Sequence, residues 1–327
     1  MTPRSVPEFP STVHVELCNT CNLACDICYC RNMKRKKGFM KPELFEKIAD
    51  EAARHAPVTI APFLHGESLL HPQFLELMAC AKSKDGITVA LDTNGTLLTE
   101  KVADEMVRIG VDSVSISFHG NSKETFESVM VGSNFEEVSA NVRYLARKAR
   151  GGHTSVTLTF VLNSRNEPEK EDFVRTWLPY VTSIVAKKEI SPESVFENWE
   201  IARDNIERPP CEVLWTSTLI LWNGDVVLCC KDYEGHIPLG NVAEQGIGEI
   251  WMSPRMQEIR AKHEKLDFTD PAMCANCETW FAYLPAESQS KDGIQVCSNV
   301  VQEVYSSPAG GGRMKALVKR LLGRSKP

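Results

Sequence analysis

The chain has 327 residues, of which 43% are hydrophobic and 24% are charged, a composition typical of a globular protein large enough for two domains. Its apolar runs are much shorter than the ~18 residues that a membrane-spanning helix needs. The formal net charge is −6, and residues 313–327 hold six basic side chains and no acid, so the rest of the chain carries −12 (−6 minus 6). An acidic body argues against a nucleic-acid-binding protein, which normally presents a basic face.

The first 17 residues contain no apolar run long enough for a signal peptide, so we expect a cytoplasmic protein with reduced cysteines. Twelve cysteines are present. In a reducing compartment, clustered cysteines indicate metal or redox chemistry rather than a disulfide framework.

Between residue 13 and about residue 187, short β-branched runs alternate with longer amphipathic stretches, which predicts βα units and a parallel sheet. Six strands are expected, at Val13–Leu17, Val58–Phe63, Ile87–Asp92, Ser113–Ser117, Ser155–Leu162 and Ser183–Lys187. Helices are expected at residues 42–54, 72–83, 99–109, 134–149 and 168–180, with Thr99 and Asn134 as N-caps and Gly110 as a C-terminal stop. The fold class is therefore α/β, an incomplete (β/α)6 barrel whose functional groups follow the strand C-termini.

The periodicity fades after residue 190, and Pro209-Pro210 indicates a domain boundary. We expect a barrel domain over 1–190, a linker over 191–210, a small cysteine-bearing domain over 211–290, and a flexible linker with a basic C-terminal helix over 291–327. The helix could make weak contact with an anionic membrane or a protein partner. A solvated basic tail is the alternative.

Three cysteines, Cys21, Cys25 and Cys28, have the spacing CxxxCxxC in the loop that follows the first expected strand. Thiolates suit iron–sulfur clusters or zinc, and a cubane cluster has four iron sites. Three protein thiolates would leave one iron open. A zinc knuckle is the alternative, because Cys18-x2-Cys21 and Cys25-x2-Cys28 also have zinc spacing.

The CxxxCxxC spacing with Asn22-Leu23 inside it resembles the radical S-adenosylmethionine (radical SAM) superfamily. The resemblance implies a [4Fe-4S] cluster on Cys21, Cys25 and Cys28 whose open iron binds the amino and carboxylate groups of S-adenosylmethionine. It also implies reductive cleavage of that cofactor to methionine and a 5′-deoxyadenosyl radical, which abstracts hydrogen from a substrate. A reducing partner such as flavodoxin or ferredoxin is implied as the electron source.

Further segments of this resemblance follow the expected strands. His65–Pro72 resembles the family's GGEPLLHP segment, Asp92–Gly95 its TNG turn, and Ser115–Gly120 its S-I-D-G segment. The resemblance implies contacts with S-adenosylmethionine from Gly66, Glu67, Ser68, Asn94 and Ser117, and adenine contacts from Ile27 or Tyr29.

The later cysteines Cys211, Cys229, Cys274 and Cys277, with Gly224 between the first two, resemble the twitch form of the SPASM-type auxiliary domain. That resemblance implies a second, fully ligated [4Fe-4S] cluster, and so two clusters per chain. Cys230 competes with Cys229 as a ligand, and Cys229 is preferred because it keeps the family spacing from Gly224. A four-cysteine zinc ribbon is the alternative.

Together the resemblances predict a radical SAM oxidoreductase that oxidises a small-molecule or peptide substrate, with the auxiliary cluster as electron acceptor. A peptide- or protein-modifying (maturase-type) enzyme and a zinc-stabilised binding protein without catalysis are the alternatives. Oxidation needs a base to take up the substrate proton, and the candidates are His65, His71, Asp92, His119, Glu189 and Glu197. Trp199 could line a substrate cavity.

Overall fold

The computed structural model describes residues 4–189, 206–291 and 293–306. Most of the expected linker, with Glu197 and Trp199, lies outside the described residues, and so does the basic tail from residue 307 onward. No helix in the described part is long and apolar enough to cross a bilayer.

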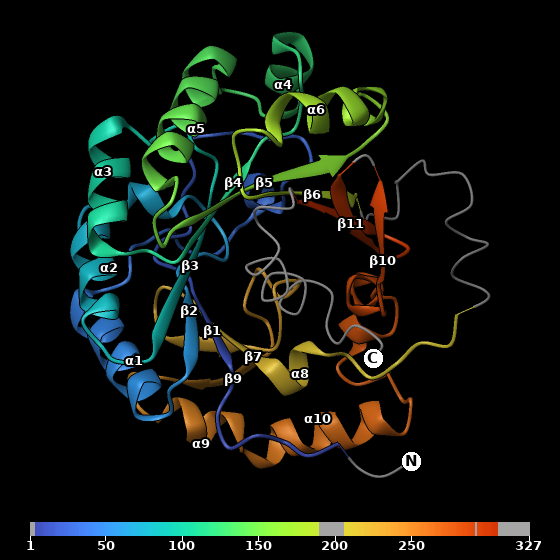
Figure 1. Cartoon of the computed structure of the whole chain (residues 1–327). Helices are drawn as coiled ribbons and strands as arrows, with labels where there is room; N and C mark the ends of the chain where they lie inside the picture. The colour runs from blue at the N-terminus through green and yellow to red at the C-terminus, as the bar shows by residue number, and fades with distance from the viewer. Residues whose placement is uncertain (1–3, 190–205, 292, 307–327) are drawn as a thin grey trace.

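A parallel sheet of six strands confirms the predicted partial (β/α)6 barrel. Its strands, which pair in chain order, are β1 (Thr12–Val15), β2 (Val58–Ala61), β3 (Ile87–Thr93), β4 (Ser113–Ser117), β5 (Ser155–Leu162) and β6 (Ser183–Lys188). The helices cover the outer face of this curved sheet (Figure 1). They are α1 (Pro42–Arg54), α2 (Phe74–Lys82), α3 (Glu100–Ile109), α5 (Phe135–Ala149) and α6 (Lys170–Trp177).

The helix ends follow the local chemistry of the sequence. The Thr99 hydroxyl accepts a hydrogen bond from the Val102 N–H at 3.3 Å, and Asn134 Oδ1 accepts one from Glu137 N–H at 3.0 Å. Gly110 has φ +84°, a left-handed conformation that ends α3. Within the barrel, one helix was not among those expected: α4 (Lys123–Val129), which has seven residues and lies between β4 and α5.

The second region extends the barrel sheet rather than forming a separate layer. Strand β7 (Ser217–Ile220) runs parallel to β1, and β8 (Asp225–Val227) and β9 (Pro238–Asn241) continue antiparallel beyond it. The helices of this region are α8 (Val213–Thr216), α9 (Ile247–Trp251) and α10 (Pro254–Glu264). Of the last two cysteines of this region, Cys274 ends a 3₁₀ turn (Ala272–Cys274), and Cys277 lies between this turn and a second one, Thr279–Tyr283.

The expectation of a flexible linker from residue 291 is wrong for residues 293–306. Strands β10 (Glu287–Lys291), β11 (Ile294–Ser298) and β12 (Gln302–Ser306) form an antiparallel meander, and β12 pairs with β6 from Ser306↔Ser183 to Gln302↔Lys187. Buried and half-buried residues alternate along β12, as is typical of a strand. The strand was missed because it spans only five residues and adjoins a sequence rich in Ser, Pro and Gly. The result is a twelve-stranded sheet in which both edges of the barrel are paired.

Candidate functional site

Loops that follow β1, β2 and β3 meet at the C-terminal edge of the parallel sheet. The Glu67 N–H donates to the Thr20 carbonyl at 2.7 Å, and Asn94 Nδ2 donates to Asn22 Oδ1 at 3.0 Å. The cysteine loop is therefore attached to both neighbouring loops, as expected for functional groups at the C-terminal end of parallel strands.

The three predicted cluster ligands belong to this cysteine loop. Cys21 is exposed, while Cys25 and Cys28 are half-buried. Burial raises the pKa of the Cys25 thiol to about 11, and the nearby Cys21 thiol adds to this rise. The Cys21 and Cys28 sulfurs accept N–H groups of the same loop, from Leu23 at 3.5 Å and from Cys30 at 3.4 Å. The thiols thus form a local group that is accessible to a cluster.

Cys18, which the zinc-knuckle alternative requires, is not part of this group. Its thiol is buried and donates to the Glu67 carbonyl at 3.1 Å. Among the residues that the structure describes, no three His, Cys, Asp or Glu side chains converge closely enough to hold a single metal ion. A cubane makes a different demand, because each thiolate binds a different iron.

Gly66 brings the β2 loop into direct contact with the cysteine loop. It has φ +85°, and a Cβ atom there would lie 2.5 Å from the Thr20 carbonyl oxygen and 2.7 Å from that of Cys18. Its N–H also donates to the Cys30 sulfur at 3.3 Å. Only glycine fits a position that combines left-handed backbone with backbone on the opposite side.

The buried Glu67 carboxylate joins the β2 loop to the β3 loop by hydrogen bonds. Glu67 is 2% exposed. It accepts hydrogen bonds from the N–H groups of Asn94 (2.7 Å) and Leu69 (3.1 Å) and from the Thr93 hydroxyl (2.8 Å). Burial nonetheless raises its pKa. The side chain points into the protein, so the predicted contact of Glu67 with S-adenosylmethionine would have to come from its main chain.

The other predicted cofactor contacts differ in their surroundings. Ser68 is buried, and its hydroxyl donates to the Pro62 carbonyl. Asn94 is also buried; its Nδ2 lies 3.8 Å from the Cys21 sulfur, and its Oδ1 accepts from Thr96. Ser117 is the last residue of β4, and Ile27 is half-buried in the cysteine loop next to Cys28. Tyr29 starts a 3₁₀ turn directly after Cys28.

In each of the three histidines predicted as bases, the ring nitrogens are hydrogen-bonded or buried. His71 lies between the Met40 carbonyl (2.8 Å) and the Gln73 N–H (3.1 Å), so neither nitrogen is available. His119 Nδ1 accepts from Val161 N–H at 3.2 Å, and burial lowers its pKa to about 4. His65 contacts Glu16 and Cys230, as described below. Of the candidates within the described residues, Asp92 and Glu189 stay predictions.

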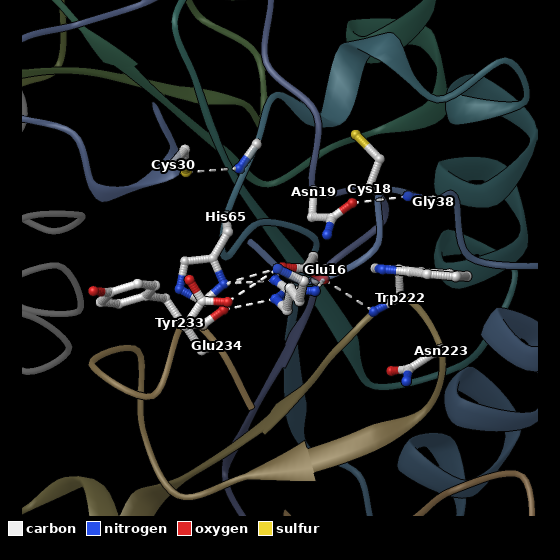
Figure 2. Close-up of polar contacts among 12 residues, drawn as sticks. Glu16, Cys18, Asn19, Cys30, Gly38, His65, Trp222, Asn223, Tyr233 and Glu234 are labelled. Carbon is white, nitrogen blue, oxygen red and sulfur yellow. Dashed lines mark hydrogen bonds and ion pairs between the residues drawn. The ribbon is translucent and has the colours of Figure 1, made fainter. Parts of the chain in front are cut away.

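A buried charged network, which the sequence reasoning missed, joins the barrel to the second region. Figure 2 shows Glu16 between His65 and Trp222. Arg35 forms a two-pronged ion pair with Glu16, in which Arg35 Nη1 lies 2.8 Å from Glu16 Oε2, and Glu16 Oε1 is 3.0 Å from His65 Nδ1. The Trp222 N–H donates to the same carboxylate at 3.1 Å. The sequence signal that could have revealed this network is Glu16 itself, a charged residue directly after the apolar strand β1.

The same network anchors the segment that carries Cys229 and Cys230. His65 Nε2 lies 3.1 Å from the Cys230 carbonyl, and Arg35 Nε donates to the Tyr233 carbonyl at 2.6 Å. The Glu234 carboxylate accepts the N–H groups of Lys34 and Arg35. Residues 230–234 are thus docked on the chain that follows the first cysteine cluster.

All four predicted auxiliary ligands line one cavity. The cysteines are Cys211, Cys229, Cys274 and Cys277, and the other lining residues include Arg208, Leu214, His263 and Trp280. Burial raises the pKa of Cys211 to about 12 and that of Cys274 to about 11, and burial beside Arg208 lowers that of His263 to about 4. Cys230, the competing ligand, is not among the lining residues.

Comparisons with known proteins agree with this geometry. The radical SAM superfamily model matches residues 15–176, and a model of an iron–sulfur cluster-binding domain, SPASM, matches residues 211–278. A "tungsten-containing aldehyde ferredoxin oxidoreductase cofactor-modifying protein" of Pyrococcus furiosus is 25% identical over 296 residues, which cover 76% of this chain and 82% of that protein.

Two solved structures share the fold. SuiB of Streptococcus suis bound to S-adenosylmethionine superposes with a TM-score of 0.67 at 14% identity, over 84% of this chain and 72% of SuiB. BtrN in complex with AdoMet and 2-DOIA gives a TM-score of 0.55 at 19% identity, over 85% of this chain and 94% of BtrN. The chain therefore belongs to the radical SAM superfamily and carries a SPASM domain after its barrel, which implies [4Fe-4S] clusters and S-adenosylmethionine as its cofactors.

Proposed function

We propose that this radical SAM protein is an oxidoreductase that removes hydrogen from an unactivated C–H bond of a small-molecule or peptide substrate, using two [4Fe-4S] clusters per chain. The observation that carries the proposal is the auxiliary cavity, which four cysteines from three separate segments line together. When bound, the clusters would supply the electron that cleaves S-adenosylmethionine to a 5′-deoxyadenosyl radical and an acceptor for the electron left on the substrate.

In this proposal Cys21, Cys25 and Cys28 hold the first cluster. The Asn94 amide and the loop N–H groups donate to the thiol sulfurs, which helps to hold the loop in its ligating shape. Gly66 and Glu67 keep the β2 and β3 loops against the cysteine loop. Cys211, Cys229, Cys274 and Cys277 hold the second cluster in a largely apolar cavity.

The substrate class rests on two observations about relatives. The Pyrococcus furiosus relative is named as a cofactor-modifying protein, which supports a small molecule. SuiB has been solved with a precursor peptide, which supports a peptide and the maturase-type alternative. Asp92 and Glu189 are the described candidates for taking up the substrate proton, and a flavodoxin or ferredoxin would supply the reducing electron.

The test is anaerobic reconstitution of the full chain, followed by iron and sulfide counts and measurement of 5′-deoxyadenosine after reduction. We expect about eight iron per chain. A Cys21/Cys25/Cys28→Ala variant should hold about four iron and form no 5′-deoxyadenosine. A Cys211/Cys274/Cys277→Ala variant should also hold about four iron but still cleave S-adenosylmethionine. Two zinc ions, no iron and no cleavage would contradict the proposal and support the zinc-stabilised alternative.

A further inference from the structure

His263 is a fully buried histidine that faces the cavity of the auxiliary cysteines. It lies in the last turn of α10, has 0% exposed surface, and lines the cavity together with all four thiols. Family resemblance did not single it out, because it stands outside the cysteine pattern. Its neighbours define what it can do there.

The proton on the His263 ring is assigned by one contact. The Cys211 N–H donates to Nδ1 at 3.4 Å, so Nδ1 presents a lone pair and the ring proton is on Nε2. The Nε2 atom is buried and has no hydrogen-bond partner among the described residues. Buried donors without partners are rare in native proteins, and each one calls for an explanation such as a bound group.

The ring orientation is held by packing. Phe268 meets the His263 ring edge-on, with ring centroids 5.0 Å apart and an interplanar angle of 85°. The guanidinium of Arg208 lies over the same Phe268 ring at 3.8 Å, and its Nη1 donates to the Ala275 carbonyl between Cys274 and Cys277. Arg208 also lines the cavity, and its Nε is a second buried donor without a partner in the described chain.

We propose that His263 donates its Nε2–H to a sulfur of the auxiliary cluster, beside the positive charge of Arg208, and thereby raises the reduction potential of that cluster. The inference rests on the proposed auxiliary cluster. Hydrogen bonds to cluster sulfurs stabilise the more negative, reduced state, and such outer-shell donors are a main control on cluster potential. A ligand role is disfavoured, because an Nε2 that carries the proton has no lone pair for iron.

Two substitutions separate the Nε2 donor from the rest of the side chain. In His263→Asn, the amide oxygen can take the place of Nδ1 and accept the Cys211 N–H, but nothing reaches the position of Nε2. In His263→Gln, the longer amide can place an N–H near that position. The two variants therefore differ in the proposed hydrogen bond at similar polarity.

The experiment is an EPR-monitored redox titration of the full chain in a Cys21/Cys25/Cys28→Ala background, after an iron count. We expect about four iron in all three proteins, a more negative midpoint potential for His263→Asn, and a potential near that of the parent for His263→Gln. Equal potentials in all three would overturn the inference. So would iron loss from both variants, which would show that His263 is needed to hold the cluster rather than to set its potential. A parent without iron would refute the auxiliary cluster itself, before any potential is measured.

Discussion

Replacing Gly66 with alanine tests whether the β2 loop presses directly on the cysteine loop. The new Cβ atom would lie 2.5 Å from the Thr20 carbonyl oxygen and 2.9 Å from the Thr20 nitrogen. Both atoms belong to the backbone, which cannot rotate away as a side chain can. The cysteine loop would have to move by roughly half an ångström or more, because Cβ contacts below 3.0 Å are essentially never seen.

The cost has two parts, and Gly110 separates them. Gly110 has nearly the same φ, +84°, but no atom lies within 4 Å of a Cβ built there. Gly110→Ala should therefore cost only the left-handed strain, about 1–2 kcal/mol. Gly66→Ala adds overpacking of about 1–3 kcal/mol, for a total of about 2–5 kcal/mol.

The assay compares both variants with the parent in two ways. Urea unfolding of the cluster-free chain gives the stability loss, and iron content with 5′-deoxyadenosine formation after reconstitution gives the effect on the first cluster. We expect Gly110→Ala to keep the iron content and 5′-deoxyadenosine formation of the parent. Gly66→Ala should lose both, even under conditions in which the variant is still folded. If both substitutions lower the free energy of unfolding equally and both variants keep the first cluster, the β2 loop does not pack directly on the cysteine loop.

Three other predictions concern the auxiliary cysteines, Asn94 and the buried Glu16 network. Cys229→Ser should lower the iron content by about four per chain, whereas Cys230→Ser should leave the count unchanged, because only Cys229 lines the cavity. Asn94→Ala should speed the loss of iron from the first cluster to a chelator several-fold, since it removes the N–H that faces the Cys21 sulfur; unchanged kinetics would contradict this role. Glu16→Gln should cost about 3–5 kcal/mol at pH 7 by urea unfolding. Burial alone would raise the Glu16 pKa, but hydrogen bonds from His65 and Arg35 outweigh it and hold the pKa below 4.5. That stability is present above the unfolded pKa and is lost as the pH falls through the folded value, so the gap between wild type and variant should narrow on acidification from pH 5.

The barrel could be predicted because its signals are local. Each strand is a short β-branched run, and residues such as Thr99 and Gly110 mark helix ends through contacts within a few positions. Strand β12 was missed for the opposite reason. Its pairing with β6 joins residues more than 100 positions apart, and nothing in the five residues from Gln302 to Ser306 announces that partner.

The sequence marks the cysteines proposed as ligands, but it does not mark the residues that hold them in place. Cysteine spacing is visible in a sequence, and the four cysteines predicted as auxiliary ligands line one cavity. Glu67 shows the limit, because the same motif that marks it cannot tell a carboxylate facing a ligand from one that accepts three hydrogen bonds inside the protein. His263 shows another limit, since only the fold brings α10 next to Cys211.

Two consecutive residues, His65 and Gly66, contact both cysteine-bearing segments. His65 Nε2 lies 3.1 Å from the carbonyl of Cys230, the neighbour of Cys229, and the Gly66 N–H lies 3.3 Å from the sulfur of Cys30 in the first cysteine loop. Glu16 and Arg35 hold His65 in a buried network of ion pairs and hydrogen bonds. A shift of His65 would therefore also move Gly66 and its contact with the first cysteine loop. The relative position of the two cysteine groups therefore depends on a carboxylate in β1's extension that touches none of the thiols proposed as ligands.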